Sequence, residues 1–225
     1  MNLSLAMEPE DRMIRRSFLL SGLRAIATAG AVLPLAAPAA GPPASAAVGR
    51  PAPAFDATDA TGQRRTLAEF KGKVVVLEWT SSTCPFAAAQ YKSARMPELQ
   101  RWAKGKGVVW LTVLSSHPSR SEYLNGAQAE TFNRKRGGAP SALLIDSSGT
   151  MGHAYGAATA DHMFVIGADG AVVYAGGIDD SDSQDPKEVA TSHNYVRAAL
   201  KEVLAGRRVA KPVTEPFGCA LAYAG

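Results

Sequence analysis

A cysteine followed directly by a proline is the part of this sequence best suited to chemistry. Cys84 comes shortly after the apolar segment 74–79, and Pro85 opens a segment with helical periodicity. Proline suits the first position of a helix, because its missing N–H would be unpaired there anyway. The positive end of the helix dipole lowers the pKa of a thiol at that position and favours the nucleophilic thiolate. We therefore expect Cys84 to be reactive; the alternative is a buried cysteine that acts as a small apolar side chain.

The strand that precedes this cysteine carries a carboxylate. Glu78 lies within a continuous apolar run, as expected of a strand that is covered on both faces. A carboxylate close to a thiol could accept its proton, whereas at an exposed strand end Glu78 would have no such role. We expect the neighbouring Trp79, together with Tyr91 and Trp110, to pack around the site.

The second of the two cysteines lies in the C-terminal tail. Cys219 follows Cys84 by 135 residues, so the spacing does not show whether the two meet. Three interpretations remain open: a static disulfide that fastens the tail, a resolving thiol that attacks oxidised Cys84, or an unpaired cysteine. A bond requires the two Cα atoms to lie within about 7 Å of each other.

Composition excludes several other functions. A net charge of +4 without a basic run interleaved with aromatic residues gives no reason to expect nucleic-acid binding. The acidic run that begins at Asp179 lacks the glycine and terminal glutamate of a calcium-binding loop, which favours a solvated loop. His117, His153 and His193 have no metal-ligand spacing. We expect neither a cofactor nor a bound metal.

The N-terminal segment reads as a targeting signal. Arg15 and Arg16 are followed by Ser17–Leu20, an Ala-rich stretch and small residues that end at Ala46. This order is typical of a cleavable twin-arginine signal, which predicts that residues 1–46 direct export to the periplasm and are then removed. The alternative is a retained membrane anchor, although the stretch is shorter than the ~20 apolar residues of a span. After cleavage we expect no stable membrane insertion.

The remaining segments alternate between strand and helix patterns. A β-α-β half followed by a β-β-α half predicts an α/β thioredoxin fold with a mixed central sheet and an N-terminal β-hairpin extension. We expect the thioredoxin-like domain to span 47–205, followed by a tail, 206–225, that carries Cys219. The expected strands are 55–60, 63–65, 74–79, 108–114, 142–145, 163–166 and 172–174, and the expected helices are 85–103, kinked or split at Pro97, 126–135 and 186–205.

Six segments of the chain match one known family in order: 78–86, 108–116, 162–166, 174–180, 194–196 and 216–219. Through them the chain resembles the peroxiredoxin-like, or redoxin, branch of the thioredoxin superfamily. The resemblance implies a thioredoxin fold, a peroxide or protein disulfide as the substrate, and a thiol as the electron donor. It also implies that Ser81 hydrogen-bonds the thiolate or a substrate oxygen, because peroxiredoxins have a threonine or serine three residues before the attacking cysteine.

Two departures from the family pattern lie close to the cysteine. Ser81 and Ala87 occupy the positions at which a C-x-x-C motif would place the partner of Cys84, so no local dithiol can form. Leu77 stands where peroxiredoxins have a proline seven residues before the cysteine.

The third departure concerns the segment before the later hairpin. Asp161 occupies the place of the thioredoxin cis-proline, in the neighbourhood where peroxiredoxins carry an arginine that stabilises the thiolate. A carboxylate near Cys84 would raise the pKa of the thiol by like-charge repulsion. A protonated His162 could offset that effect, unless its ring faces elsewhere.

The sequence therefore predicts a periplasmic thiol–disulfide oxidoreductase or peroxiredoxin-like antioxidant protein. Cys84 is the expected nucleophile, Cys219 the expected resolving thiol, and Pro85, Trp79 and Glu78 are expected to line the site. Two alternatives remain. One is a non-catalytic module that binds copper or zinc through Cys84 and His162, since thiolate with imidazole suits these metals. The other is a redoxin that has lost its activity.

Overall fold

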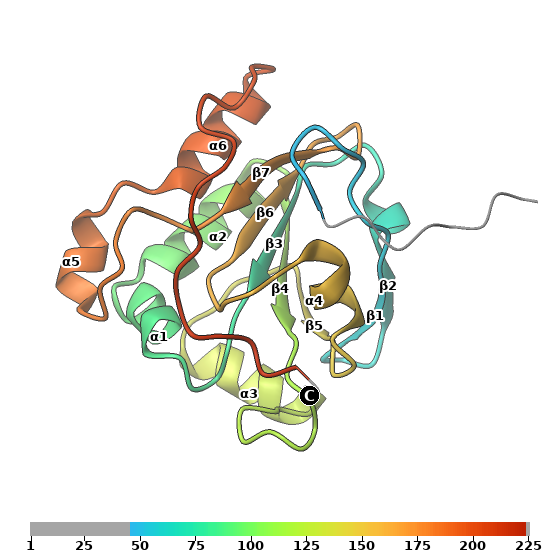
Figure 1. Ribbon diagram of the computed structural model, residues 1–225, viewed down its shortest axis with the longest axis vertical. Helices are drawn as coiled ribbons and strands as arrows, with labels where there is room; N and C mark the ends of the chain where they lie inside the picture. The colour runs from blue at the N-terminus through green and yellow to red at the C-terminus, as the bar shows by residue number, and fades with distance from the viewer. Residues whose placement is uncertain (1–45, 224–225) are drawn as a thin grey trace, which may run out of the picture. The chain divides into compact units, whose positions relative to one another are not determined.

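The computed structural model describes residues 46–223, so the expected signal, apart from its last residue, lies outside the described residues. Figure 1 shows a central sheet with helices packed against it. None of the helices in residues 46–223 is long and apolar enough to cross a bilayer. The elements in chain order are β1 (Asp56–Asp59), β2 (Arg64–Thr66), a 3-10 turn (Leu67–Phe70), β3 (Val75–Trp79), α1 (Pro85–Lys92), α2 (Arg95–Gly105), β4 (Val109–Leu114), α3 (Gly126–Lys135), β5 (Ala142–Ile145), α4 (Thr150–Tyr155), β6 (Met163–Ile166), β7 (Val172–Gly176), α5 (Pro186–Thr191) and α6 (Tyr195–Leu204).

The strands form one mixed sheet in the order β2-β1-β5-β4-β3-β6-β7. β3, β4 and β5 are parallel to one another, whereas β6 runs antiparallel to β3 and forms a hairpin with β7. The predicted N-terminal hairpin is β1 and β2, and β1 extends the sheet by pairing antiparallel with β5. These pairings confirm the predicted thioredoxin fold with its N-terminal extension.

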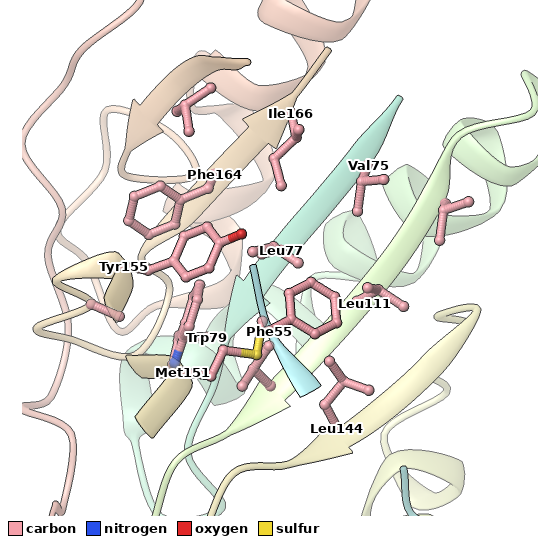
Figure 2. Close-up of a cluster of buried hydrophobic side chains, with 14 of the residues drawn as sticks. Phe55, Val75, Leu77, Trp79, Leu111, Leu144, Met151, Tyr155, Phe164 and Ile166 are labelled. Atoms are coloured by element: carbon pink, nitrogen blue, oxygen red, sulfur yellow. The ribbon is translucent and has the colours of Figure 1, made fainter. Parts of the chain in front are cut away.

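The two faces of β3 point into different cores. Val75, Leu77 and Trp79 face a cluster that includes Phe164 and Tyr155, which Figure 2 shows close together over the sheet. Residues at the alternate positions, Val76 and Glu78, face the side covered by α2 and α6. Because successive strand side chains point to opposite faces, Glu78 and Trp79 cannot line the same cavity although they are adjacent in the sequence.

The predicted helix 85–103 is two helices, and the position of the break corrects the prediction. α1 ends at Lys92, and α2 begins at Arg95 after Ala94, which has a left-handed φ of 64°. Pro97 does not cause the break. It lies in the first turn of α2, where a proline removes no intrahelical hydrogen bond.

The predicted helix 186–205 is also divided. α5 ends before Ser192, which has extended backbone angles, and α6 starts after Asn194, whose side chain accepts a hydrogen bond from the amide of Arg197. Asparagine is a favoured N-cap because its side-chain oxygen pairs with a free amide of the first turn. α4 was not predicted, because its six residues are too few to show a helical period.

The C-terminal tail returns along the domain. After α6 it forms a parallel bridge between Val213 and Ala175 of β7, and it then passes α1, where Phe217 packs against Phe86 with ring centroids 6.4 Å apart. Figure 1 shows this path from α6, past α1, to the end of the chain near α3 and α4. The tail therefore reaches the end of the sheet at which Cys84 lies.

Candidate functional site

Cys84 is the N-cap of α1. Its backbone is extended (φ −75°, ψ 119°), and Pro85 is the first residue of the helix. Its side chain is 2% exposed and packs with Ala87 and Ala160. The local sequence therefore placed this cysteine correctly, at a helix start that directly follows a buried strand.

The sulfur of Cys84 is bonded to that of Cys219, and the two Cα atoms are 5.6 Å apart. The bond excludes the unpaired interpretation of Cys219 for the structure described. It is compatible with both of the others, a static bridge and a resolving thiol. The backbone N–H of Cys219 also donates to Cys84 Sγ at 3.2 Å.

Backbone pairing holds the tail beside the site. The amide of Ala160 donates to the carbonyl of Cys219 at 2.8 Å, and the amide of Leu221 donates to the carbonyl of Ala158 at 3.0 Å, so the two segments run antiparallel. Gly218 has a φ of +124°, and a Cβ at this position would meet the carbonyl oxygen of Ala160. A glycine is required here because both the backbone angle and the close approach exclude other side chains.

The last described residues add further contacts. The ring of Tyr223 packs against that of His153 in a tilted arrangement with centroids 4.3 Å apart, and the Tyr223 hydroxyl donates to the carbonyl of Ala157 at 2.7 Å. The amide of His117 donates to the carbonyl of Ala222 at 3.0 Å. The disulfide is thus one of several interactions that fasten the tail over Cys84.

Glu78 is fully buried and accepts hydrogen bonds from four side chains, so the exposed-end interpretation is wrong. One carboxylate oxygen accepts from the hydroxyl of Tyr91 at 2.6 Å. The other oxygen accepts from Gln100 at 2.8 Å, Trp110 at 2.7 Å and Thr112 at 2.8 Å. Because these donors surround both oxygens, Glu78 fixes the position of Tyr91 on α1.

Two other expected site residues make contacts away from the sulfur. Trp79 packs in the opposite core, and its indole N–H donates to Ser115 at 3.0 Å. Ser81 is buried close to Cys84 in the chain, and its hydroxyl accepts from the amide of Thr83 at 3.4 Å. In the oxidised form Ser81 therefore hydrogen-bonds within its own loop.

Asp161 is buried directly after the segment that pairs with the tail. Its φ of +67° is closed to proline, whose ring fixes φ near −65°, so this backbone could not hold the family's proline. Within residues 46–223 neither carboxyl oxygen has a hydrogen-bond partner. Burial raises the pKa of Asp161 well above its usual value; Glu78 and Asp179 raise it further, and Arg136 lowers it. Up to that raised pKa the carboxyl is neutral and does not repel the thiolate.

Replacing this carboxyl with an amide is expected to stabilise the protein at neutral pH. The raised folded-state pKa means that the folded chain holds a proton that the unfolded chain releases near pH 4, so this contribution to stability is lost as the pH rises. Asp161→Asn cannot ionise and tolerates a positive φ, so its free energy of unfolding should exceed that of the original protein by about 1 to 2 kcal/mol near pH 7.5. Urea titrations from pH 4 to pH 8 measure the difference.

The matched control is Asp161→Ala, which also removes the charge but suits a positive φ poorly. It should be less stable than Asp161→Asn at every pH. An Asp161→Asn difference that shrinks as the pH rises would contradict the buried, neutral carboxyl.

His162 does not supply the positive charge that the sequence suggested. Its ring stacks on Phe164 with centroids 4.5 Å apart, and its Nδ1 accepts from the amide of Ala158 at 3.4 Å. Burial lowers the pKa of His162 to about 4. The imidazole is therefore neutral near pH 7, and the expected offset by protonated His162 is wrong.

The cation near the site is instead Arg136, which the sequence analysis missed. It follows α3 directly, donates from Nη1 to the hydroxyl of Thr80 at 3.0 Å, and lies over the ring of Tyr91, 3.7 Å from its centroid. Arg136 and Cys84 line the same pocket, of about 350 Å³. The sequence carried no signal for this placement, because the two residues are separated by 52 positions and basic residues are common at helix ends.

The structure places no three His, Cys, Asp or Glu side chains of residues 46–223 where they could hold a metal together. In the disulfide form, moreover, Cys84 has no thiolate to offer a metal. The proposed pair of Cys84 and His162 thus concerns the reduced protein alone.

Comparisons with known proteins agree with this geometry. Residues 47–192 match the family model for Redoxin. No curated protein matches the chain.

Solved structures share the fold. A hypothetical protein from Sinorhizobium meliloti is 24% identical with a TM-score of 0.67, over 81% of this chain and 97% of that one. An uncharacterized conserved protein from Geobacillus kaustophilus is 22% identical with a TM-score of 0.68, over 79% and 93%. A putative protein disulfide isomerase from Bacteroides thetaiotaomicron is 20% identical with a TM-score of 0.50, over 71% and 91%. With the family match over most of the described residues, the sheet order and the cysteine at the start of α1, this chain belongs to the redoxin family of the thioredoxin superfamily.

Proposed function

We propose that this protein is a thiol–disulfide oxidoreductase in which Cys84 and Cys219 form the redox pair. The observation that carries the proposal is the disulfide between a helix N-cap and a terminal tail. A thiolate at a helix N-terminus is stabilised by the helix dipole, so Cys84 is the more readily activated nucleophile of the two. Pro85 supports this role by starting the helix at the next residue.

The proposed cycle needs no cofactor. In the reduced protein the Cys84 thiolate attacks a substrate disulfide, forms a mixed disulfide and releases one substrate thiolate, which takes up a proton. The Cys219 thiolate then attacks Cys84 Sγ and releases the second substrate thiolate. The substrate gains two electrons, and the Cys84–Cys219 bond forms. A thiol electron donor restores the two thiols by the reverse exchange.

A peroxide is the second candidate oxidant, and the groups around Cys84 favour it. Ser81 and Arg136 line the same pocket as Cys84, so a hydroxyl and a cation belong to the cavity that a peroxide would enter. The Cys84 thiolate would attack one peroxide oxygen, become a sulfenic acid and release an alcohol or water. Cys219 would then attack the sulfenic acid, expel water and form the same disulfide.

The proposed place of action is the periplasm. The twin-arginine pattern near Arg15 supports export, and a disulfide persists best in an oxidising compartment. The proposed partners are protein disulfides and a thiol donor.

Single cysteine variants test the cycle. Cys219→Ser should accumulate a mixed disulfide at Cys84 when it is treated with hydroxyethyl disulfide, because no resolving thiol remains. Cys84→Ser should exchange at a rate lower by roughly 100-fold or more, because the activated thiolate is gone. Mass spectrometry under non-reducing conditions follows both reactions.

Hydrogen peroxide provides the second arm of this experiment. A sulfenic acid at Cys84 of Cys219→Ser identifies a peroxide oxidant, and its absence alongside normal disulfide exchange limits the substrate to disulfides. If Cys84 reacts with neither, the proposed enzyme activity is wrong and the inactive-redoxin alternative stands. An anaerobic Cu(I) titration of the reduced protein and of Cys84→Ala tests the metal-binding alternative.

A further inference from the structure

The pocket beside Cys84 is cationic. It lies between α1 and the C-terminal end of α3, and its volume is about 350 Å³, at the small end of the range for small-molecule sites. Three of its lining residues are basic and none is acidic. The lining consists of Ser81, Ser82, Cys84, Ala88, Tyr91, Lys92, Phe132, Lys135 and Arg136.

Arg136 is held rigidly in this pocket. Its guanidinium lies between two aromatic rings, 3.7 Å from the centroid of Tyr91 and 4.3 Å from that of Phe132. The Tyr91 hydroxyl is held by its hydrogen bond to Glu78 at 2.6 Å, and Nη1 of Arg136 donates a hydrogen bond to the hydroxyl of Thr80. The guanidinium is therefore preorganised, which reduces the entropy lost when it binds an anion.

Among the described residues, two donor nitrogens of Arg136 lack partners, and its charge is not neutralised by a carboxylate. Nε and Nη2 are buried and have no hydrogen-bond partner, and no ion pair joins Arg136 to a carboxylate, within residues 46–223. A buried donor without a partner costs free energy, because it has lost its hydrogen bonds to water. Because both nitrogens are buried, a carboxylate reaches them only when the neighbouring side chains shift. It would then remove this cost, because guanidinium and carboxylate form paired, charge-assisted hydrogen bonds.

We propose that this pocket binds a small organic anion that carries a thiol, with its carboxylate near Arg136 and its sulfur at Cys84. The inference rests on the proposed function and names the class of its electron donor: low-molecular-weight carboxylate thiols and their disulfides. Lys92 and Lys135, both exposed, add positive charge at the pocket.

The exchange balances without a further reactant. The thiolate of the small donor attacks Cys84 Sγ, the Cys84–Cys219 bond breaks, and Cys219 leaves as a thiolate that takes up a proton. A second donor thiolate attacks the sulfur of the bound donor and releases the Cys84 thiolate. Two donor thiols become one small disulfide, and the protein gains two electrons.

Matched small thiols test the charge preference. We compare the rates at which 3-mercaptopropionate, β-mercaptoethanol and cysteamine reduce the Cys84–Cys219 disulfide, each at the same thiolate concentration. Each rate is divided by the rate of the same thiol with hydroxyethyl disulfide, which removes differences in intrinsic reactivity. We expect the anionic thiol to react about tenfold faster than the neutral one, with the cationic thiol slowest, and we expect 0.5 M salt to reduce the preference.

Variants locate the preference in the pocket. Arg136→Gln should lower the ratio of anionic to neutral rates the most, and Arg136→Lys should retain more of it. Lys135→Gln changes an exposed residue, so it should fold normally and lower the ratio by a smaller factor. Lys104→Gln, also an exposed lysine but on α2 and outside the pocket lining, is the matched control and should leave the ratio unchanged.

A binding measurement separates this proposal from the redox cycle. S-methyl-3-mercaptopropionate carries the carboxylate but has no thiol, so it should slow the alkylation of Cys84 in the reduced protein and should do so less in Arg136→Gln. Equal normalised rates for the three thiols, or a preference that Arg136→Gln and Lys135→Gln leave intact, would overturn the proposal while the exchange function stood. Failure of every thiol to reduce the disulfide would overturn the proposed function itself.

Discussion

Reduction of the Cys84–Cys219 disulfide is expected to lower the free energy of unfolding by about 3 to 5 kcal/mol. The bond joins residues 135 positions apart. In the unfolded chain this cross-link removes conformational entropy, so the oxidised protein gains stability relative to its unfolded state. For a protein of this size the change corresponds to a melting temperature lower by roughly 10 °C. Urea titrations with and without reductant measure it.

The double variant Cys84→Ser/Cys219→Ser provides the control. Its stability should be independent of reductant and close to that of the reduced protein. The tail retains its backbone pairing with residues 158–160 in both cases, so a loss below about 1 kcal/mol would show that these contacts, rather than the bond, fasten the tail.

The same free energy affects the redox chemistry. Folding and disulfide formation belong to one thermodynamic cycle. The free energy by which the disulfide stabilises the folded state is therefore also the free energy by which folding stabilises the disulfide. A value of about 4 kcal/mol corresponds to a reduction potential roughly 85 mV lower than that of the same cysteine pair in the unfolded chain. We therefore expect the reduced protein to be an effective donor of electrons to substrate disulfides.

Acidification is expected to destabilise the protein through His162. The folded-state pKa of about 4 lies below the unfolded value of about 6.5, so between these pH values the unfolded chain binds a proton that the folded chain does not. The free energy of unfolding should fall as the pH decreases through this window, by about 3 kcal/mol in total, since each pKa unit corresponds to about 1.4 kcal/mol. His162→Gln keeps a hydrogen-bond acceptor and should lose this part of the pH dependence.

The difference in free energy of unfolding between His162→Gln and the original protein has an internal reference at high pH. Above pH 7.5 the imidazole is neutral in both states, so the difference should be constant there and should change only as the pH falls below about 6.5. A difference that stays constant down to pH 4 would contradict the buried neutral imidazole. The contribution of Asp161 to the pH dependence has the opposite sign: because its folded-state pKa is raised, it lowers the free energy of unfolding as the pH rises. The experiment is therefore repeated in the Asp161→Asn background.

The sequence determined the parts of this protein that depend on local patterns. The continuous apolar runs of β3 and β4 identify strands covered on both faces, and the turn residues between β6 and β7 identify a hairpin. Pro85 fixes the start of α1, so the position of Cys84 at a strand end and a helix start follows from neighbouring residues. The order of these elements was sufficient to predict the thioredoxin fold.

Helix ends were predicted less well, because they depend on single backbone positions. The left-handed Ala94 separates α1 from α2, yet alanine is a strong helix former and gives no sign of this. Asn194 was a recognisable N-cap within the predicted helix 186–205, and it does begin α6. The α5–α6 boundary could thus have been found, whereas the α1–α2 boundary could not.

Only the tertiary structure decided which distant residues surround Cys84. Cys219 and Arg136 lie far from Cys84 in the sequence, and the fold places one in the disulfide and the other in the adjoining pocket. It also decided that the carboxylate of Glu78 is hydrogen-bonded and that the carboxyl of Asp161, within the described residues, is not. Burial, rather than residue type, raises the pKa of Asp161 and lowers that of His162. The sequence thus identified the reactive cysteine, and the three-dimensional packing supplied its partner, its cation and the charges around it.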